Sequence, residues 1–227
     1  MPDQMLRQNR ELKEIGVWNW TLPALGARLD DGRTVLTCPN AGACASLCYA
    51  RNGTYLFPKV KAAHARNLKR VLDNLDGWKL DMIAEARKRA AGRYVRIHDS
   101  GDFFDDGYLA AWLEIAAAVP ETTFYAYTKE VSRFKRMVEG RAPSNFKWLY
   151  SMGGKEDHLI NVVNDRHAEV FHSTDALEAA GYFNQEASDI LAIEAPTNKI
   201  GIVANNIPHF KKKQGGETFG SLQKVRG

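Results

Sequence analysis

The chain is poor in cysteine and has no long hydrophobic run. It contains three cysteines in 227 residues, and an odd number of thiols cannot all pair in internal disulfides. No uninterrupted stretch of about 18 apolar residues occurs, so neither a membrane span nor a membrane partner is expected. Residues 1–13 are polar and charged and lack the apolar segment of a secretory signal. These absences predict a cytoplasmic protein whose thiols stay reduced.

An excess of basic side chains is confined to the C-terminal end. The formal net charge is +4, and the segment 207–227 accounts for it, because five basic residues there face Glu217 alone. The five are Lys211, Lys212, Lys213, Lys224 and Arg226. The rest of the chain is balanced in charge, which argues against a basic domain that covers nucleic acid. We therefore expect a solvated basic tail, with weak nucleic-acid contact as the alternative.

Hydrophobic periodicity predicts alternating strands and helices. Apolar residues at helical spacing after Pro58 predict a helix to about Leu75. More helices are expected over 78–90, 106–119, 131–139 and 174–180. An extended segment is expected at 17–27, and runs of β-branched and aromatic residues predict strands at 34–37, 94–97, 122–127, 147–150, 168–171, 190–193 and 199–203.

This βα alternation with short connections predicts an α/β fold with parallel strands. An open sheet with helices on both faces and a TIM-like barrel, complete or partial, both fit the order. We favour the barrel, because polar residues recur at the C-terminal ends of successive strands, where barrel enzymes build their sites. The predicted organisation is a solvated arm at 1–15, one barrel domain at 16–206 and the basic tail at 207–227.

The three cysteines stand close together in the stretch TCPNAGACASLCYA. Cys38, Cys44 and Cys48 have the spacing C-x5-C-x3-C on a loop after a short predicted strand. Clustered thiolates on a loop are typical of iron–sulfur sites, and three ligands would leave one iron of a [4Fe-4S] cluster open. A structural zinc site is one alternative, and three buried cysteines without a metal are another. The fourth zinc ligand would be a histidine: His64, His98 or His172.

Two polar loops after predicted strands are candidate substrate or cofactor sites. In RIHDSGDFF, a strand ends at His98, Asp99 and Asp102. The histidine could bind iron or transfer a proton, and the carboxylates could orient it or bind amines and hydroxyls. In FYAYTKE, Tyr127 and Lys129 end the next strand, and the lysine could bind a carboxylate or phosphate. The alternatives are helix capping in the first loop, and core packing with a local ion pair in the second.

Weaker candidate sites lie elsewhere. Polar or glycine residues also end later predicted strands, at 151–154, at His172 and at Asn205 and Asn206. The helix that begins at Pro58 has a basic face. Its members are Lys59, Lys61, Arg66, Lys69 and Arg70. That face predicts either contact with phosphates or an ordinary solvated helix surface.

The stretches TCPNAGACASLCYARNGTY, RIHDSGDFF, YLAAW and FYAYTKE together resemble a protein family of actinobacteria and their phages, catalogued as gene product 88. The resemblance runs from about Trp18 past Tyr150 and on to about Asn206. It implies a bacteriophage protein that works in the cytosol of a bacterial host.

The segment from Cys44 to Ala50 is also similar to the cluster loop of radical S-adenosylmethionine enzymes. This second resemblance implies a βα-type partial barrel in which Cys38, Cys44 and Cys48 hold a [4Fe-4S] cluster. S-adenosylmethionine would bind the open iron, and Gly101 would lie near its methionine part.

Three functions follow from these features. The first is a cytosolic [4Fe-4S] enzyme with radical chemistry on a small-molecule substrate. Its substrate or cofactor would be surrounded by His98, Asp99, Gly101, Asp102, Tyr127, Lys129 and His172. The second is a non-catalytic redox or sensor protein whose fourth iron is capped by a side chain. The third is a zinc-stabilised module that binds nucleic acid through its basic helix and tail.

Overall fold

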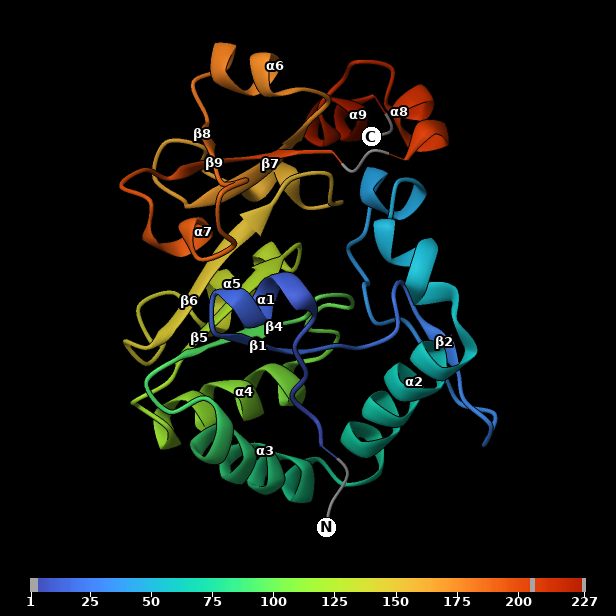
Figure 1. The fold of residues 1–227 in the computed structure, drawn as a ribbon, viewed down its shortest axis with the longest axis vertical. Coiled ribbons are helices and arrows are strands. Elements are labelled where there is room, and N and C mark those ends of the chain that lie inside the picture. Colours follow the sequence, from blue (N-terminus) through green and yellow to red (C-terminus); the bar gives the residue numbers. More distant parts are fainter. Residues whose placement is uncertain (1–3, 205–206, 226–227) are drawn as a thin grey trace. The chain divides into compact units, whose positions relative to one another are not determined.

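The computed structural model describes residues 4–204 and 207–225 (Figure 1). Asn205 and Asn206, expected after the last strand, and Arg226 of the basic tail lie outside this range. Seven strands form one sheet in the order β1-β4-β5-β6-β7-β9-β8. The strand pairs with a defined register run parallel within this sheet. The predicted α/β fold with parallel strands is therefore confirmed.

The sheet is open rather than closed. Its order ends at β1 on one side and at β8 on the other, and no barrel closes within the described range. The predicted TIM-like barrel, complete or partial, is therefore not what these residues form. Barrel closure depends on pairing between strands far apart in sequence, and polar strand ends occur in open parallel sheets as well.

The chain divides into two compact units. The first unit comprises Met1–Pro39, Ala50–Ala126 and Arg133–Lys147, and the second comprises Asn40–Tyr49, Tyr127–Ser132 and Trp148–Gly227. Cys38 therefore belongs to the first unit, whereas Cys44 and Cys48 belong to the second.

The first unit contains β1 (Val17–Trp20), β4 (Tyr94–Ile97) and most of β5 (Thr123–Thr128), and β4 pairs with both of the others. The helices α3 (Leu75–Arg89) and α4 (Asp106–Ala118) pack side by side (Figure 1). Helix α4 begins where the Asp105 side chain accepts a hydrogen bond from the Tyr108 amide. That cap satisfies an amide that the helix itself leaves without a partner.

An aromatic cluster forms the core of this unit. The Trp78 ring centroid lies 5.5 Å from that of Trp20, 5.4 Å from that of Tyr108 and 5.3 Å from that of Trp112. These four side chains are buried and join β1, α3 and α4. Each tilted or edge-on pair contributes about 0.5–1.5 kcal/mol beyond the area it buries.

The N-terminal segment lies along β1. The backbones of Arg7 and Asn19 form an antiparallel bridge, and α1 (Arg10–Glu14) follows with Asn9 as its cap. Leu6 and Leu12 are buried. The range 1–15, expected as a solvated arm, therefore includes residues that pack into the first unit.

Helix α2 (Pro58–Asp73) has proline in its first turn, as expected, and ends at Asn74. The side chain of Asn74 accepts a hydrogen bond from the Gly77 amide and so begins α3. The two short strands β2 (Ala27–Arg28) and β3 (Thr34–Val35) pair antiparallel in a separate ribbon. The strand expected before Cys38 is thus not part of the parallel sheet.

The second unit contains most of β6 (Phe146–Ser151), with β7 (His167–Phe171), β9 (Lys199–Val203) and β8 (Phe183–Asn184). Its core includes Leu149, Ala168, Ala192, Ala195 and Ile200. The helices in this part of the sequence are α5 (Val131–Met137), which spans a unit boundary, α6 (Thr174–Ala179), α7 (Leu191–Glu194), α8 (Pro208–Gln214) and α9 (Phe219–Lys224).

One predicted strand is a helix. Residues 190–193 fall largely in α7. The carbonyl oxygens at the end of this helix accept hydrogen bonds from Arg166, a residue that precedes β7. The Arg166 guanidinium donates to the carbonyl oxygens of Ala192, at 2.7 Å, and Ala195, at 3.0 Å. A short apolar run fits a strand or a helix equally well, and here this tertiary contact favours the helix. The strand β8 was not predicted.

None of the helices within the described ranges combines the length and the apolar character that a membrane crossing demands.

Candidate functional site

The three cysteines do not form a metal centre. Cys38, Cys44 and Cys48 are reduced and half-buried. Within residues 4–204 and 207–225, no group of three or more His, Cys, Asp or Glu side chains is placed to hold a metal ion. The predicted [4Fe-4S] cluster, the S-adenosylmethionine on its open iron, the capped redox or sensor cluster and the zinc site are therefore wrong. The similarity to radical S-adenosylmethionine enzymes is not supported.

Backbone packing explains the small residues of the cysteine loop. In the second unit, the Cys44 amide donates to the Gly153 carbonyl at 3.0 Å. The Ala43 amide donates to Gln223 Oε1, on α9, at 2.7 Å. A Cβ at Gly42 would lie 1.9 Å from that same oxygen. Small residues here let α9 approach the loop, so they need no cluster to account for them.

His98 is a core residue of the first unit. It is 3% exposed and has a φ of +69°. Its Nε2 lies 2.8 Å from Tyr108 Oη, which also accepts a hydrogen bond from Trp20 Nε1 at 2.8 Å. Burial lowers the pKa of His98 to about 3, so the imidazole is neutral near pH 7.

The residues after His98 are held by the same local structure. Gly101 has a φ of +89°, and a Cβ there would lie 2.6 Å from Leu22 Cβ. Asp102 is buried and accepts a hydrogen bond from the Phe103 amide at 2.8 Å. Glycine at 101 thus permits both the backbone turn and the close approach of Leu22.

Three of the predicted site residues lie in the second unit. Tyr127 Oη donates to Gln185 Oε1 at 2.6 Å. Lys129 Nζ donates to Ser151 O at 2.9 Å, to Ser151 Oγ at 2.7 Å and to Met152 O at 2.9 Å. His172, directly after β7, is exposed. The tyrosine and the lysine therefore connect strand ends within this unit.

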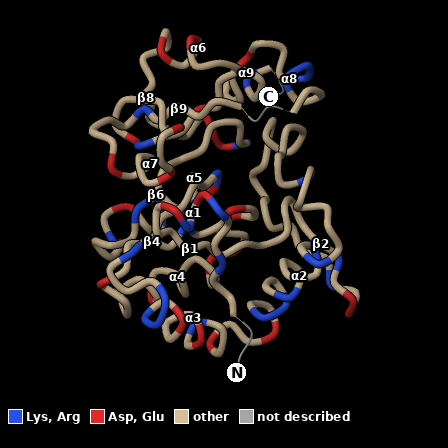
Figure 2. The backbone as a smooth tube through the Cα atoms, in the orientation of Figure 1, with Lys and Arg blue, Asp and Glu red and all other residues tan. Residues whose placement is uncertain are grey.

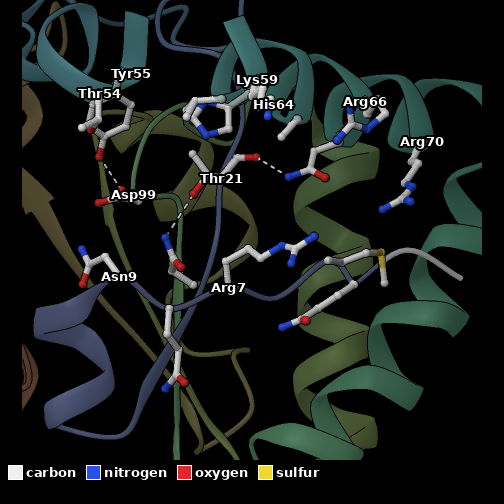
Figure 3. Close-up of a pocket in the computed structure, with 17 residues that line it drawn as sticks. Arg7, Asn9, Thr21, Thr54, Tyr55, Lys59, His64, Arg66, Arg70 and Asp99 are labelled. Carbon is white, nitrogen blue, oxygen red and sulfur yellow. Dashed lines mark hydrogen bonds between the residues drawn. The ribbon is translucent and has the colours of Figure 1, made fainter. Parts of the chain in front are cut away.

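A pocket of about 470 Å³ lies in the first unit (Figure 3). Its walls come from the N-terminal segment, from β1 and its end, from the turn η3 (Gly53–Leu56), from one face of α2, and from the loop after β4. The lining residues are Gln4, Met5, Arg7, Gln8, Asn9, Asn19, Thr21, Thr54, Tyr55, Lys59, Val60, Ala63, His64, Arg66, Asn67, Arg70 and Asp99. Asp99 is the one member of the predicted substrate site among them.

Helix periodicity brings the basic residues of α2 to the pocket. Lys59, Arg66 and Arg70 line it together with Ala63, and positions three and four apart in a helix share a face. Figure 2 marks the positions of several Lys and Arg residues in blue along the backbone of α2. Lys61 and Lys69 of the predicted basic face do not line the pocket. Lys69 instead pairs with Asp73 at 2.7 Å.

The lining is strongly positive. It contains four cationic side chains, of which Arg7 comes from the N-terminal segment, and a single carboxylate, Asp99. No described residue forms an ion pair with Arg7, Lys59 or Arg66. Figure 3 shows Arg66 and Arg70 at one end of the view and Asp99 with Tyr55 at the other. The pocket therefore has a cationic end and an end rich in hydrogen-bond acceptors.

The acceptor end is held by internal hydrogen bonds. Tyr55 Oη donates to Asp99 Oδ2 (Figure 3). Thr21 accepts from two amides: its hydroxyl from Asn19 Nδ2 at 3.2 Å and its carbonyl from Asn67 Nδ2 at 2.9 Å. Burial lowers the pKa of His64, and the nearby Asp99 opposes this shift. These contacts fix side chains from four separate segments around one cavity.

Sequence reasoning identified part of this site. It found the basic face of α2 and it found Asp99, but it placed them in different sites. It missed Arg7, Asn19 and Tyr55. A polar residue inside the otherwise apolar strand VWNW was a signal for Asn19, because a buried amide needs hydrogen-bond partners.

Comparison with known proteins agrees with the sequence resemblance. The family model described as Gene product 88 matches residues 3–225. The Gene 88 protein of Mycobacterium phage L5 is 37% identical over 102 residues, which cover 41% of this chain and 43% of that protein. The Gene 88 protein of Mycobacterium phage D29 is 33% identical over 102 residues, covering 41% of this chain and 42% of that protein. The matched region thus spans less than half of either relative. No solved structure matches the chain.

Proposed function

The chain belongs to the Gene product 88 family, and from that premise we propose that it is a binding protein for a phosphorylated small molecule. The ligand would occupy the pocket of the first unit. The single observation that supports this most is the composition of the lining, with four cations facing one carboxylate.

The size of the pocket is suited to a small ligand. Its volume of about 470 Å³ falls inside the range of about 300–1,000 Å³ that is usual for cofactor and metabolite sites. A positive cavity concentrates field lines and attracts anions. Phosphate is a good match for arginine, because the planar guanidinium can donate two parallel hydrogen bonds to it.

The arginines of α2 are placed for this task. Arg66 and Arg70 are one helical turn apart and both line the pocket. Rigid helices hold functional groups more accurately than loops do. We infer that these two side chains bind the phosphate, with Arg7 and Lys59 adding positive charge.

The test is isothermal titration calorimetry of the full chain with inorganic phosphate, pyrophosphate and ribose 5-phosphate. Removing a charge-assisted hydrogen bond costs about 1.5–3 kcal/mol, so R66A should weaken binding by about 10- to 150-fold. The matched control is K61A, because Lys61 is an exposed cation of the same helix that does not line the pocket. Equal loss in R66A and K61A would show that only the overall charge matters, and no binding at all would refute the proposal.

The basic tail supports a second proposal, weak contact with nucleic acid. Lys211, Lys212 and Lys213 follow one another on α8, and all three are exposed (Figure 2). Such a contact releases counterions, so the logarithm of the affinity for single-stranded DNA should fall linearly with the logarithm of salt concentration. The variant K211A/K212A should reduce that slope. Binding that does not respond to salt would contradict the proposal.

A further inference from the structure

The acceptor end of the pocket contains an unusual polar atom. Asn19 is 7% exposed and lines the pocket, and its Oδ1 is buried with no hydrogen-bond partner among the described residues. The amide nitrogen of the same side chain is already bonded to Thr21 Oγ1. The orientation of the amide is therefore set, and the oxygen is left to accept a bond. A buried acceptor without a partner is rare in folded proteins.

The neighbouring groups at this end are also acceptors. Asp99 offers a carboxylate held by Tyr55 Oη. Asp99 also lies 3.8 Å from Arg96 Nη1, but a phosphate placed directly against this carboxylate would still be repelled by it. The two ends of the pocket therefore require one molecule with two different parts. One part is an anion for Arg66 and Arg70, and the other carries N–H or O–H donors.

Two aromatic rings of the pocket indicate what the donor-carrying part of the ligand is. Tyr55 and His64 both line the pocket, with ring centroids 6.0 Å apart. The Tyr55 hydroxyl is bound to Asp99, which anchors the end of this side chain at the pocket. An anchored ring beside acceptors suits a flat base that carries amino donors, since bases stack on aromatic side chains. Carboxylates are also common partners of ribose hydroxyls.

We propose that the ligand of this pocket is a nucleoside phosphate, with its phosphate on the arginines of α2 and its base and sugar at Asn19, Asp99 and Tyr55. This inference rests on the phosphate-binding function proposed above and adds the class of ligand. The base stacks on the Tyr55 ring, a donor of the base bonds to Asn19 Oδ1, and the sugar hydroxyls bond to Asp99.

The experiment compares nucleotides with their fragments on the full chain. Calorimetric titrations use AMP, GMP, CMP and UMP, with ribose 5-phosphate and pyrophosphate as fragments that lack a base. At least one nucleotide should bind about tenfold more tightly than ribose 5-phosphate, because stacking and the bond to Asn19 are added. If fragments bind and no nucleotide exceeds them, the nucleoside inference is refuted while the phosphate site stands. If nothing binds, both fall together.

Two variants of Tyr55 test the contact itself. Y55L removes the ring and should weaken the preferred nucleotide by about tenfold while it leaves pyrophosphate within about twofold. Y55F keeps the ring and should stay close to the wild type for the nucleotide. Tyr55 is half-buried on a surface turn, so both variants are expected to fold. Equal losses for nucleotide and pyrophosphate in Y55L would overturn the proposed placement of the base.

A third variant, N19L, removes the unpartnered acceptor. It should reduce the preference for a base that carries an amino group over UMP, whose uracil lacks one. An unchanged ranking of the four nucleotides would show that Asn19 does not contact the base.

Discussion

Replacing Gly101 with alanine should destabilise the first unit more than the same change at Gly92. Both glycines have positive φ angles, +89° and +67°. A side chain in that conformation costs about 1–2 kcal/mol. The Cβ at position 101 would also lie 2.6 Å from Leu22 Cβ, whereas nothing lies within 4 Å of a Cβ at position 92.

The difference between the two variants isolates the clash with Leu22. Overpacking of a buried site costs about 1–3 kcal/mol, so G101A should lose about 2–5 kcal/mol and G92A about 1–2 kcal/mol. The gain from restricting the unfolded chain is the same for both glycines and cancels in the comparison. Since native stabilities are about 5–15 kcal/mol, the loss in G101A is a large part of the total.

The assay is urea unfolding of the full chain followed by near-ultraviolet circular dichroism. This signal comes from all the tryptophans of the chain, and four of the five belong to the first unit. For a chain of this size, each kcal/mol also lowers the melting temperature by about 2–4 °C. G92A is the matched control for backbone strain alone. Equal destabilisation of the two variants, or a G101A variant as stable as the wild type, would refute the argument that Gly101 is needed for the contact with Leu22.

Two further predictions concern stability, and two concern the pocket. Burial lowers the pKa of His98 to about 3. The folded state therefore binds a proton at this ring less readily than the unfolded state does. The stability due to the neutral ring is fully present above about pH 6.5 and is lost as the pH falls toward 3. Thermal melts between pH 7 and pH 4 should show this slope, and H98Q should flatten it; an unchanged slope would count against the assignment. D105A removes the cap of α4 and should cost about 1 kcal/mol in urea unfolding, with D76A, in an exposed first turn of α3, as the control. R66A should weaken phosphate binding and K61A should not. Y55L should weaken nucleotide binding selectively, as described above.

Local patterns were sufficient for much of the fold. The strand at 94–97 was predicted with its observed bounds, because Tyr94, Val95 and Ile97 have strong strand propensity and a glycine precedes them. The strand at 199–203 was also predicted with its observed bounds. The strand predicted at 190–193 is wrong, because its four apolar residues fit the period of a strand or of a helix equally well. The contact that favours the helix comes from Arg166.

The cysteine prediction failed for a related reason. Close spacing of thiols in the sequence can indicate a metal centre, but it does not determine where the side chains lie in the fold. Here the loop follows a two-stranded ribbon rather than a strand of the sheet. Its Gly42 makes room for Gln223, a residue far later in the chain whose side chain accepts from the Ala43 amide 180 positions away in the sequence. Such a contact could not be predicted from a single sequence.

The reasoning about strand ends assumed a barrel, but part of it applies to the open sheet as well. Polar residues were expected to gather where parallel strands end, and in the first unit Thr21 follows β1 and Asp99 follows β4 at the pocket. Open parallel sheets bind ligands at that edge just as barrels do. From the sequence alone, the basic face of α2 could not be distinguished from an ordinary solvated helix surface. The fold brings that face to the pocket. Once it does, the basic surface of α2 forms the positively charged side of a cavity that also contains Asp99 and Asn19. The ligand that we propose carries its charge and its donors at opposite ends.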